Sequence, residues 1–449
     1  MRQFFGTDGV RGIANKYPMT VDTALKLGQA AAVIFSKKHR HGRFLIGKDT
    51  RLSCYMFENA IAAGIMSMGA DVIFVGPLPT PAIAHLTTSM RADAGIVISA
   101  SHNPFNHNGI KFFASNGYKL PDEIELEIEK LMLSEKLNDY LALNEKIGRS
   151  KRIEDASGRY ITFSKNTFPQ NLTLDGMRLV VDCANGASYK VAPLIFEELG
   201  AEVFPVGVSP NGLNINSHCG ALYPEYASEE VHKYRADMGI ALDGDADRVI
   251  FIDEKGEIVD GDAILYLIAA HMMKKGKLKD NTLVTTIMSN IGLDKGIEKL
   301  GGKVVRTAVG DRYVVNSMLK NHYNLGGEQS GHIIFLDHTT TGDGIVAALQ
   351  VLSIIKETGK TLSELTKDMK KIPQILTNIN IKSKPKLEDI SELQKVLKDG
   401  RKKLGKSGRL FVRYSGTEMK ARILIETEDK NLAQKLTDEI SDILKMHCV

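Results

Sequence analysis

Apolar runs that stop abruptly in polar loops recur along the chain. Residues 44–51 (FLIGKDTR), 178–186 (RLVVDCANG) and 282–290 (TLVTTIMSN) each have the pattern of a buried strand followed by a loop. Each is followed by a helix-like stretch, a glycine and a second apolar run. Glycine after a helix is typical of a left-handed C-cap, and strands that alternate with helices indicate parallel or mixed sheets covered by helices. The pattern therefore predicts three related α/β units.

A second repeat links two of these units. Residues 92–104 (ADAGIVISASHNP) and 236–248 (ADMGIALDGDADR) both begin with Ala-Asp, one further residue, Gly and an apolar run. Any α/β protein contains similar strand–helix units, so the helices alone do not distinguish duplication from coincidence. The shared Ala-Asp-x-Gly segment favours internal duplication. When the two segments are laid over each other, Ser101 falls on Asp245.

The last part of the chain has a different pattern. Residues 375–381, 409–415 and 421–427 predict strands, and 388–400 predicts a helix. A final amphipathic helix over about 430–446 places four apolar residues on one face. These are Leu432, Leu436, Ile440 and Leu444.

We therefore expect three related α/β domains with mixed sheets, followed by a small C-terminal α+β domain, around a central cleft. A chain of 449 residues is too long for one ordinary core, which agrees with several domains. The predicted domains are 1–152, 153–252, 253–370 and 371–449.

Composition narrows the class of protein. Hydrophobic residues make up 43% and charged residues 25%, and the formal net charge of +4 indicates neither a nucleic-acid nor a membrane partner. The first residues, MRQFFGTDGVRG, lack the apolar core of a signal peptide, and no run approaches the ~20 apolar residues of a membrane span. The four scattered cysteines form no CxxC pair, so we expect a reduced, cytoplasmic protein.

The loop over 242–248 (LDGDADR) is a candidate metal site. Asp243, Asp245 and Asp247 would repel one another unless a cation or strong donors compensate their charge, and hard oxygen ligands suit Mg²⁺. A calcium-binding EF-hand is excluded because its sixth position should be Gly, whereas Arg248 stands there. A solvated acidic turn is the simple alternative. Arg248 beside the three aspartates also suits a site that handles phosphate.

The loop over 99–104 (SASHNP) is a candidate for group transfer. Ser101 could act as a nucleophile with His102 beside it, although the surroundings are not the G-x-S-x-G of hydrolases. A Ser-His pair by itself is more often a turn. If the two repeated strand ends face one cleft, however, Ser101 could carry a phosphoryl group, and a phosphate oxygen could be a further ligand of the metal.

Two further loops carry groups suited to sugars and anions. The segment 326–332 (GGEQSGH) offers acceptors and donors for sugar hydroxyls, with a polar hairpin turn as the alternative. Its candidate residues are Glu328, Gln329, Ser330 and His332. The segment 413–422 (RYSGTEMKAR) suits a phosphate nest, with a basic hairpin as the alternative. Its candidate residues are Arg413, Ser415, Gly416, Thr417 and Arg422.

These four loops, in this order and over essentially the whole chain, resemble the α-D-phosphohexomutase superfamily. The resemblance implies that Ser101 is phosphorylated in the active enzyme and that one Mg²⁺ binds to the phosphoserine and the three aspartates. It implies that Glu328 and Ser330 hold sugar hydroxyls. The groups implied to hold the phosphate that is not reacting are Arg413, Ser415, Gly416, Thr417 and Arg422. Those implied to surround the reacting phosphate are Arg11, Lys111 and Arg248. Lys111 or His332 is the implied acid/base.

Within the superfamily, residues 5–12 (FGTDGVRG), 309–314 (VGDRYV) and Gln329 resemble the bacterial phosphoglucosamine mutases. That branch implies interconversion of glucosamine 6-phosphate and glucosamine 1-phosphate through a bisphosphorylated sugar, feeding UDP-N-acetylglucosamine and cell-wall precursor synthesis. A phosphomannomutase or phosphoglucomutase is the alternative enzyme, and a non-catalytic sugar-phosphate binding protein is the alternative outside catalysis. The oligomeric state is open, with a homodimer as one option.

Two positions depart from the superfamily pattern. Met419 stands where proline usually follows the SGTE sequence, and His107 stands where an aspartate often precedes Asn-Gly. The first departure concerns the stiffness of the phosphate loop, and the second concerns local hydrogen bonding.

Overall fold

The structure is a computed structural model that describes residues 3–6, 8–36, 42–405, 407–415 and 419–448. The chain divides into two compact units. Unit 1 comprises Met1–Ile287 and Val304–Thr366, and unit 2 comprises Met288–Lys303 and Lys367–Val449. None of the helices in the described ranges has the length and apolar character needed to cross a membrane. The domain boundaries near residues 152, 252 and 370 stay a prediction.

The first sheet of unit 1 has the strand order β1-β5-β4-β2-β3-β6. Strand β2 runs parallel to β3 and β4, whereas β5 runs antiparallel to β4 and to β1. The strands are β1 (Val10–Ile13), β2 (Arg43–Lys48), β3 (Asp71–Pro77), β4 (Ala94–Ile98), β5 (His107–Ala114) and β6 (Ser150–Arg152). The helices are α1 (Val21–Phe35), α2 (Ser53–Ser67), α3 (Thr80–Ser89) and α4 (Asp122–Met132), with short 3₁₀ turns at Glu135–Tyr140 and Asn144–Lys146.

The second sheet repeats this arrangement with the order β11-β10-β9-β7-β8. Strand β7 is parallel to β8 and β9, and β10 is antiparallel to β9. The strands are β7 (Arg178–Asp182), β8 (Glu202–Val206), β9 (Met238–Leu242), β10 (Val249–Ile252) and β11 (Ile258–Val259). The helices are α5 (Ala156–Lys165), α6 (Val191–Glu197) and α7 (Pro224–Tyr234).

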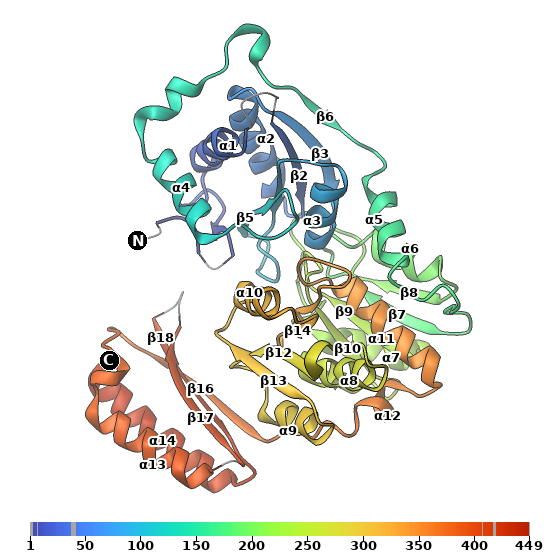
Figure 1. Cartoon of the computed structure of the whole chain (residues 1–449), viewed down its shortest axis with the longest axis vertical. Coiled ribbons are helices and arrows are strands. Elements are labelled where there is room, and N and C mark those ends of the chain that lie inside the picture. Colours follow the sequence, from blue (N-terminus) through green and yellow to red (C-terminus); the bar gives the residue numbers. More distant parts are fainter. Residues whose placement is uncertain (1–2, 7, 37–41, 406, 416–418, 449) are drawn as a thin grey trace. The chain divides into compact units, whose positions relative to one another are not determined.

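The third sheet has the order β13-β12-β14-β15, with β12 parallel to β14 and β14 antiparallel to β15. Its strands are β12 (Thr282–Thr286), β13 (Lys303–Thr307), β14 (Leu325–Gly327) and β15 (Ile333–Phe335). The helices of this region are α8 (Gly261–Lys274), α10 (Asp311–Asn321), α11 (Gly344–Thr358) and α12 (Leu362–Thr366), with a 3₁₀ turn at Lys279–Asn281. The predicted fold class, related α/β units with mixed sheets, is thus confirmed (Figure 1).

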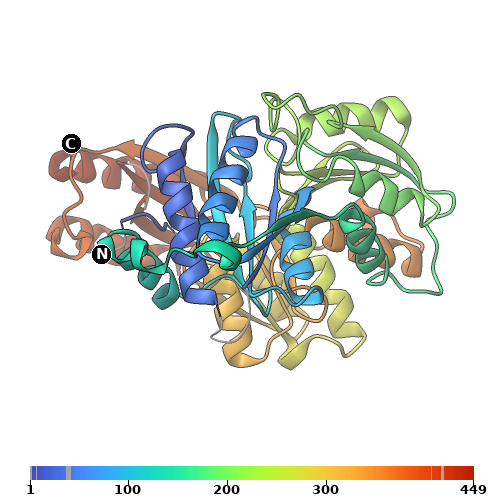
Figure 2. The same cartoon turned by 90° about the horizontal axis from the view of Figure 1, so that it is seen from above.

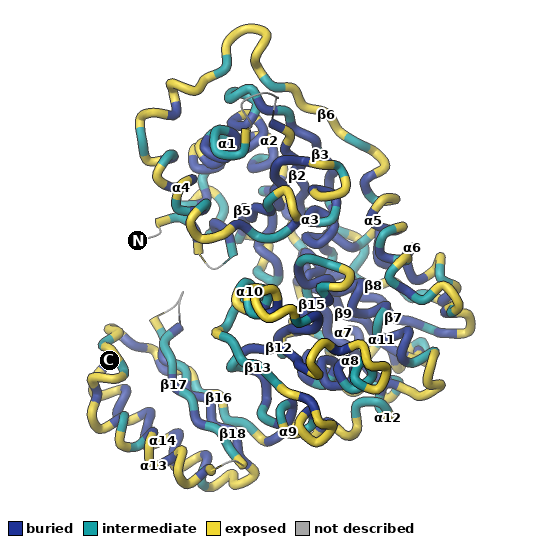
Figure 3. Tube along the Cα trace, viewed as in Figure 1, coloured by how far each residue is buried: buried dark blue, intermediate teal, exposed yellow. Residues whose placement is uncertain are grey.

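Helices cover both faces of the first sheet. Phe44 and Ile46 of β2 pack in the apolar core with α1 and α2. The next residue, Gly47, faces the other way, because a Cβ there would lie 2.2 Å from Ile83 of α3. Side chains alternate along a strand, so α2 and α3 lie on opposite faces, as right-handed crossovers require. Figures 1 and 2 show these helices flanking the sheet, and Figure 3 shows the buried strands between them.

In each of the three repeated strand–helix segments, the glycine after the helix has the predicted left-handed conformation. The φ angles are +84° at Gly69, +103° at Gly200 and +84° at Gly301. A side chain at such a φ is strained, so glycine is the residue that ends these helices at lowest cost. The three glycines stand at equivalent points, after α2, α6 and α9 (Ile291–Lys299).

The Ala-Asp-x-Gly repeat has a structural cause at its aspartate. The Oδ2 atom of Asp93 accepts the backbone N–H of Arg43 at 2.9 Å, and Oδ2 of Asp237 accepts that of Arg178 at 2.8 Å. Arg43 and Arg178 are the first residues of β2 and β7. Each aspartate therefore fixes the start of the parallel strand next to its own.

The glycine of the repeat lets the preceding helix approach the strand closely. A Cβ at Gly95 would lie 2.0 Å from Thr87 Oγ1 of α3, and one at Gly239 would lie 2.9 Å from Val231 Cγ2 of α7. Both distances are shorter than any ordinary contact, so any larger residue would push the helix away from the sheet.

A third copy of the motif, which the sequence analysis missed, lies in the third sheet. The Oδ1 atom of Asn324 accepts the backbone N–H of Lys279 at 3.0 Å, just before β12. A Cβ at Gly326 would lie 2.6 Å from Met318 Sδ of α10. Asparagine replaces aspartate here, which hides the repeat from a search for Ala-Asp-x-Gly.

Unit 2 holds an antiparallel sheet of order β16-β18-β17 covered by two helices. Its elements are β16 (Gln374–Asn380), α13 (Ser391–Leu404), β17 (Arg409–Tyr414), β18 (Lys420–Glu426) and α14 (Lys430–Cys448), with a 3₁₀ turn at Leu387–Asp389. The predicted apolar face of α14 is confirmed, because Leu436, Ile440 and Leu444 are buried in the core and Leu432 packs against it. Helix α9 joins this unit, where the N–H of Ile291 donates to Glu426 Oε2 at 3.2 Å.

The close approach at Gly95 generates a stability prediction. We expect Gly95→Ala to lower the free energy of unfolding by about 1–3 kcal/mol, because the new methyl group must displace Thr87, whose hydroxyl is fixed by a 2.7 Å bond to Ile83 O. Gly158→Ala is the matched control. Gly158 is an exposed position of helix α5 with nothing within 4 Å of its added Cβ, so the substitution should stabilise the protein by about 0.5–1 kcal/mol. Urea unfolding followed by circular dichroism measures both, and equal midpoints would contradict the packing argument.

Candidate active site

The two repeated strand ends meet in space. Ser101 follows β4, is almost fully buried, and has φ +52°. Its Oγ donates a hydrogen bond of 2.6 Å to Asp243 Oδ2, although the two residues lie 142 positions apart. The predicted juxtaposition of the serine loop and the aspartate loop is therefore present in the structure.

The three aspartates after β9 form one cluster. Oxygen atoms from Asp243, Asp245 and Asp247 all lie within 4.8 Å of one another, and all three residues are buried. Burial raises the pKa of the Asp243 carboxyl well above its usual range, and the charges of Asp247 and Asp245 raise it further. The Oδ1 atoms of Asp245 and Asp247 have no hydrogen-bond partner among the described residues. Buried carboxylate oxygens without donors are the ligands that a hard divalent cation needs, so the cluster could hold a metal ion.

Lys111 brings positive charge to the cluster from β5. Its Nζ lies 2.8 Å from Asp245 Oδ2 and 3.2 Å from Asp8 Oδ2. Burial disfavours the charged form, but the carboxylates of Asp245 and Asp8 outweigh it and raise the pKa of Lys111. Arg11 of β1 forms an ion pair with the same Asp8. Lys111 thus lies beside the aspartate cluster and Arg11 beside Asp8, and both remain protonated.

Arg248 connects the metal loop to the serine loop. Its backbone N–H donates to Asp243 Oδ1 at 3.2 Å, and its Nη1 lies 3.3 Å from His102 Nδ1. Burial lowers the pKa of His102 to about 4, with Arg248 and Arg11 adding to the effect. His102, whose Nδ1 lies 3.3 Å from Ser101 Oγ, is therefore neutral near pH 7.

The predicted sugar loop contributes Glu328 and His332. Glu328 follows β14, and its Oε1 accepts the N–H of Gly310 at 3.1 Å. His332 is buried, with Nδ1 3.8 Å from Asp247 and Nε2 3.5 Å from Asp311. Burial lowers the pKa of His332, but Asp247 and Asp311 reverse this and raise it. Ser330, by contrast, is exposed.

The predicted phosphate loop lies in unit 2. Arg413 and Arg422 are register partners on β17 and β18. Burial, and then the charge of Arg422, lowers the pKa of Arg413, as expected of two neighbouring guanidinium groups that an anion would stabilise. Ser415 O accepts a 2.7 Å bond from Lys384 Nζ, a cation that the sequence analysis did not name. Gly416 and Thr417 lie outside the described residues.

Several residues of the site were missed by sequence reasoning. Lys119 pairs with Asp8 and, at 2.6 Å, with Asp311 Oδ2. Asp8 and Asp311 lie in the two segments, 5–12 and 309–314, that the sequence analysis used only for family resemblance. Thr80 Oγ1 donates to Asp245 Oδ2 at 2.7 Å. These contacts join residues more than 100 positions apart, except that Asp8 also binds Arg11 locally, so only the shared acidic character of the two segments could have indicated them.

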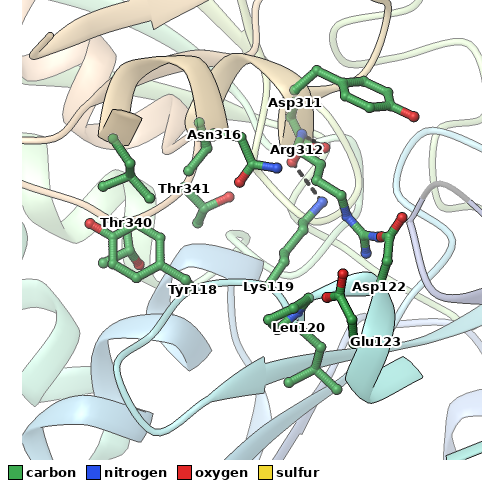
Figure 4. A pocket seen from close by; sticks show the side chains of 14 residues that line it. Tyr118, Lys119, Leu120, Asp122, Glu123, Asp311, Arg312, Asn316, Thr340 and Thr341 are labelled. Atoms are coloured by element: carbon green, nitrogen blue, oxygen red, sulfur yellow. Dashed lines mark hydrogen bonds and ion pairs between the residues drawn. The ribbon is translucent and has the colours of Figure 1, made fainter. Parts of the chain in front are cut away.

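A cavity of about 290 Å³ adjoins these ion pairs, between the chain leading into α4 and helix α10. Figure 4 shows Lys119 extending toward Asp311 on its wall. Arg312, on the cavity wall, forms a bidentate pair with Glu125, with Nη2–Oε1 2.5 Å and Nη1–Oε2 3.1 Å. Arg312 thereby fixes the start of α10, next to the Gly310 N–H that orients Glu328.

Comparisons with known proteins agree with this fold. Four family models match in order: phosphoglucomutase/phosphomannomutase alpha/beta/alpha domain I (residues 2–139), domain II (158–256), domain III (260–372) and the C-terminal domain (376–443). Phosphoglucosamine mutase of Geobacter metallireducens is 58% identical over 445 residues, covering 99% of each chain. Phosphoglucosamine mutase of Myxococcus xanthus is 57% identical over 444 residues, covering 99% of this chain and 97% of that one.

Solved structures show the same fold. A phosphoglucomutase/phosphomannomutase family protein of Burkholderia thailandensis has a TM-score of 0.79 and 21% identity, covering 98% of this chain and 97% of that one. N-acetylphosphoglucosamine mutase of Aspergillus fumigatus, in complex with GlcNAc-6P and magnesium, has a TM-score of 0.71 and 19% identity, covering 100% and 96%. The fold is thus that of the phosphohexomutase class. Within that class, the chain belongs to the phosphoglucosamine mutase family.

The aspartate cluster generates a metal-binding prediction. We expect the protein to bind one divalent cation, and Asp247→Asn to weaken that binding at least about tenfold, because it removes a charge and a ligand oxygen at nearly constant volume. Asp253→Asn is the control, since Asp253 is also buried but only accepts the N–H groups of its own turn. Titration calorimetry with Mg²⁺ and Mn²⁺ measures both variants. Unchanged affinity in Asp247→Asn would mean that the cluster is a structural turn.

Proposed function

We propose that the chain interconverts glucosamine 6-phosphate and glucosamine 1-phosphate by way of a phosphorylated Ser101. The observation that carries the proposal is the 2.6 Å contact between Ser101 Oγ and the buried aspartate cluster, since a hydroxyl beside such carboxylates suits a group carrier next to a cation. The full-length identity to phosphoglucosamine mutases supports the choice of sugar.

Two half-reactions are proposed at one serine. In the first, the bond between phosphorus and Ser101 Oγ breaks and a bond from phosphorus to a sugar hydroxyl oxygen forms, giving a bisphosphorylated sugar. The proton of that hydroxyl passes to a base and from the base to the leaving Ser101 Oγ. Ser101 thus ends as a hydroxyl, the state in which it donates to Asp243. In the second, the sugar has reversed its orientation and its other phosphate returns to Ser101 by the same bond changes. Because the sugar reverses, the same charged residues around Ser101 serve both phosphoryl transfers.

The residues around Ser101 suit the charge that develops on the transferred group. Lys111 and Arg248 stay protonated beside the aspartates and present fixed positive charge in a buried site, where electrostatic stabilisation is strongest. Mg²⁺, held by Asp243, Asp245 and Asp247, would supply further positive charge to the phosphoryl oxygens.

The remaining roles follow from the positions of the other groups. Because the carboxylates of Asp245 and Asp8 keep Lys111 protonated, we propose His332 as the proton carrier and Lys111 as a charge-compensating group. Glu328 would hold a sugar hydroxyl with the oxygen that Gly310 does not occupy, and Ser330 would add a second bond. We propose that Arg413, Ser415, Gly416, Thr417 and Arg422 bind the phosphate that is not reacting. A cytoplasmic location is proposed as well, and a homodimer is the assembly that light scattering would test.

The serine assignment is tested by mass and turnover. We expect active protein to carry one phosphoryl group on Ser101, and Ser101→Ala to lose at least about 10³-fold in kcat while still folding and unfolding cooperatively, because the hydroxyl is required for covalent transfer. Intact mass before and after phosphatase treatment, together with thermal unfolding, checks this. An active alanine variant would remove the serine from the mechanism.

The choice of sugar is tested by comparing the kcat/KM values of three hexose phosphates. We expect kcat/KM for glucosamine 1-phosphate to exceed that for glucose 1-phosphate and mannose 1-phosphate by about ten- to hundredfold, since one charge-assisted hydrogen bond to the C2 ammonium is worth ~1.5–3 kcal/mol. All three sugars are assayed under one set of conditions. If glucose or mannose is preferred, the chain is a phosphoglucomutase or phosphomannomutase, and if none is turned over by phosphorylated protein, the proposal fails.

A further inference from the structure

Ser101 is held in an unfavourable backbone conformation. A φ of +52° is left-handed, a conformation that is unfavourable for a residue with a side chain and persists only where the surroundings impose it. The Oγ reaches Asp243 from this conformation, so relaxation of the backbone would turn the Cα–Cβ bond and carry Oγ away from the aspartates. Some group must therefore hold the loop.

Two buried side chains hold the backbone carbonyls of the loop. Arg51 Nη2 donates to Ser101 O and Asn103 O, both at 2.8 Å, and its Nη1 donates to Pro104 O at 2.5 Å. Asn216 Nδ2 donates to the same first two carbonyls, at 2.9 Å and 3.1 Å. Both amide hydrogens of Asn216 are thus used, and the peptide plane that follows Ser101 is fixed by two donors.

Asn216 contacts the serine loop although it lies 115 positions from Ser101 along the chain. It lies in the loop between β8 and α7, and its own N–H donates to Ala184 O at 2.9 Å. That loop docks on the chain around Arg51, where the Leu52 N–H donates to Gly212 O at 2.9 Å. The loop that carries Asn216 is therefore fixed both to Ala184 and to the chain around Arg51.

The metal loop is fitted to the same two groups. A Cβ at Gly244 would lie 2.7 Å from Ser101 O and 2.8 Å from Asn216 Nδ2. Gly244 stands between Asp243 and Asp245, so the carbonyl of Ser101, the amide of Asn216 and the backbone of the metal loop pack without spare room. The position of the serine relative to the aspartates depends on this three-way contact.

We propose that Asn216 is a positioning residue for phosphoryl transfer: its amide holds Ser101 in the left-handed conformation that directs Oγ at the aspartate cluster. The inference rests on the proposed function of Ser101 as the phosphoryl carrier. Asn216 touches neither substrate nor the reacting atoms, and its effect passes through the Ser101 and Asn103 carbonyls.

Asn216→Gly tests the proposal, because glycine keeps the positive φ of +57° at this position and removes only the amide. Asn214→Gly is the matched control. It makes the same change in the same loop, and its amide bonds Ser209 O and accepts from Asn211 N, without contact to the serine loop. With protein phosphorylated at Ser101, we expect kcat for glucosamine 1-phosphate to fall about 10- to 100-fold in Asn216→Gly, with KM within about threefold, as a misplaced reacting group predicts. The control should keep kcat within about twofold.

Three outcomes would overturn the proposal: an unchanged kcat in Asn216→Gly, an equal loss in both variants, or a loss confined to KM. Amide hydrogen exchange over residues 99–106 gives a readout that does not need turnover. Faster exchange there in Asn216→Gly than in wild type and Asn214→Gly supports the proposal that Asn216 holds the serine loop. Equal exchange in all three proteins contradicts it. If wild-type protein turns over no hexose phosphate, the proposed function fails, and the exchange measurement still decides on the role of Asn216.

Discussion

Three carboxylates crowded into a buried loop are the constraint on which the rest of the site depends. Two unit charges about 5 Å apart repel by roughly 3 kcal/mol at an effective dielectric constant of ~20, and the cluster of Asp243, Asp245 and Asp247 contains three such pairs. The surroundings of the cluster supply what this arrangement needs: the ammonium of Lys111, the backbone N–H of Arg248 and the hydroxyls of Ser101 and Thr80. The same excess of negative charge that would unfold an uncompensated loop makes this one a receptor for a cation and, with that cation, for a phosphoryl group.

Repetition of one α/β unit explains how such a site could be assembled from distant segments. Asp93, Asp237 and Asn324 stand directly before β4, β9 and β14, and each holds the chain at or just before the start of the neighbouring parallel strand. A glycine two residues later, in β4, β9 or β14 itself, admits the preceding helix. The carboxyl ends of these strands, where the variable loops begin, then become equivalent places for function. One end carries the serine, the second carries the aspartates, and the third carries Glu328.

The sequence predicted local features and one long-range feature. The glycine C-caps, the strands and the amphipathic face of α14 follow from local pattern, and the meeting of Ser101 with the aspartate loop follows from the repeat. The overlay makes Ser101 and Asp245 equivalent positions in two repeats, and the carboxylate that Ser101 contacts is that of Asp243. Asp8, Lys119 and Asp311 had no signal beyond the acidic character of their segments, since an ion pair between distant segments leaves no periodic pattern. Arg51 and Asn216 lie in ordinary-looking loops, and their role comes from carbonyls that any residue would present.

Lys119 illustrates how a structural ion pair also governs reactivity. Lys119 lies on the wall of a cavity large enough for a small molecule, so its amine would be expected to react with acylating reagents. Burial disfavours the ammonium form, but the carboxylates of Asp311 and Asp8 raise its pKa above that of an ordinary lysine. Only the unprotonated amine is nucleophilic, so the partners that require the charge of Lys119 also withhold its lone pair. Small electrophiles should therefore react with exposed lysines before they react with Lys119. Lys119 stays unreactive for as long as its ion pairs with Asp311 and Asp8 remain formed.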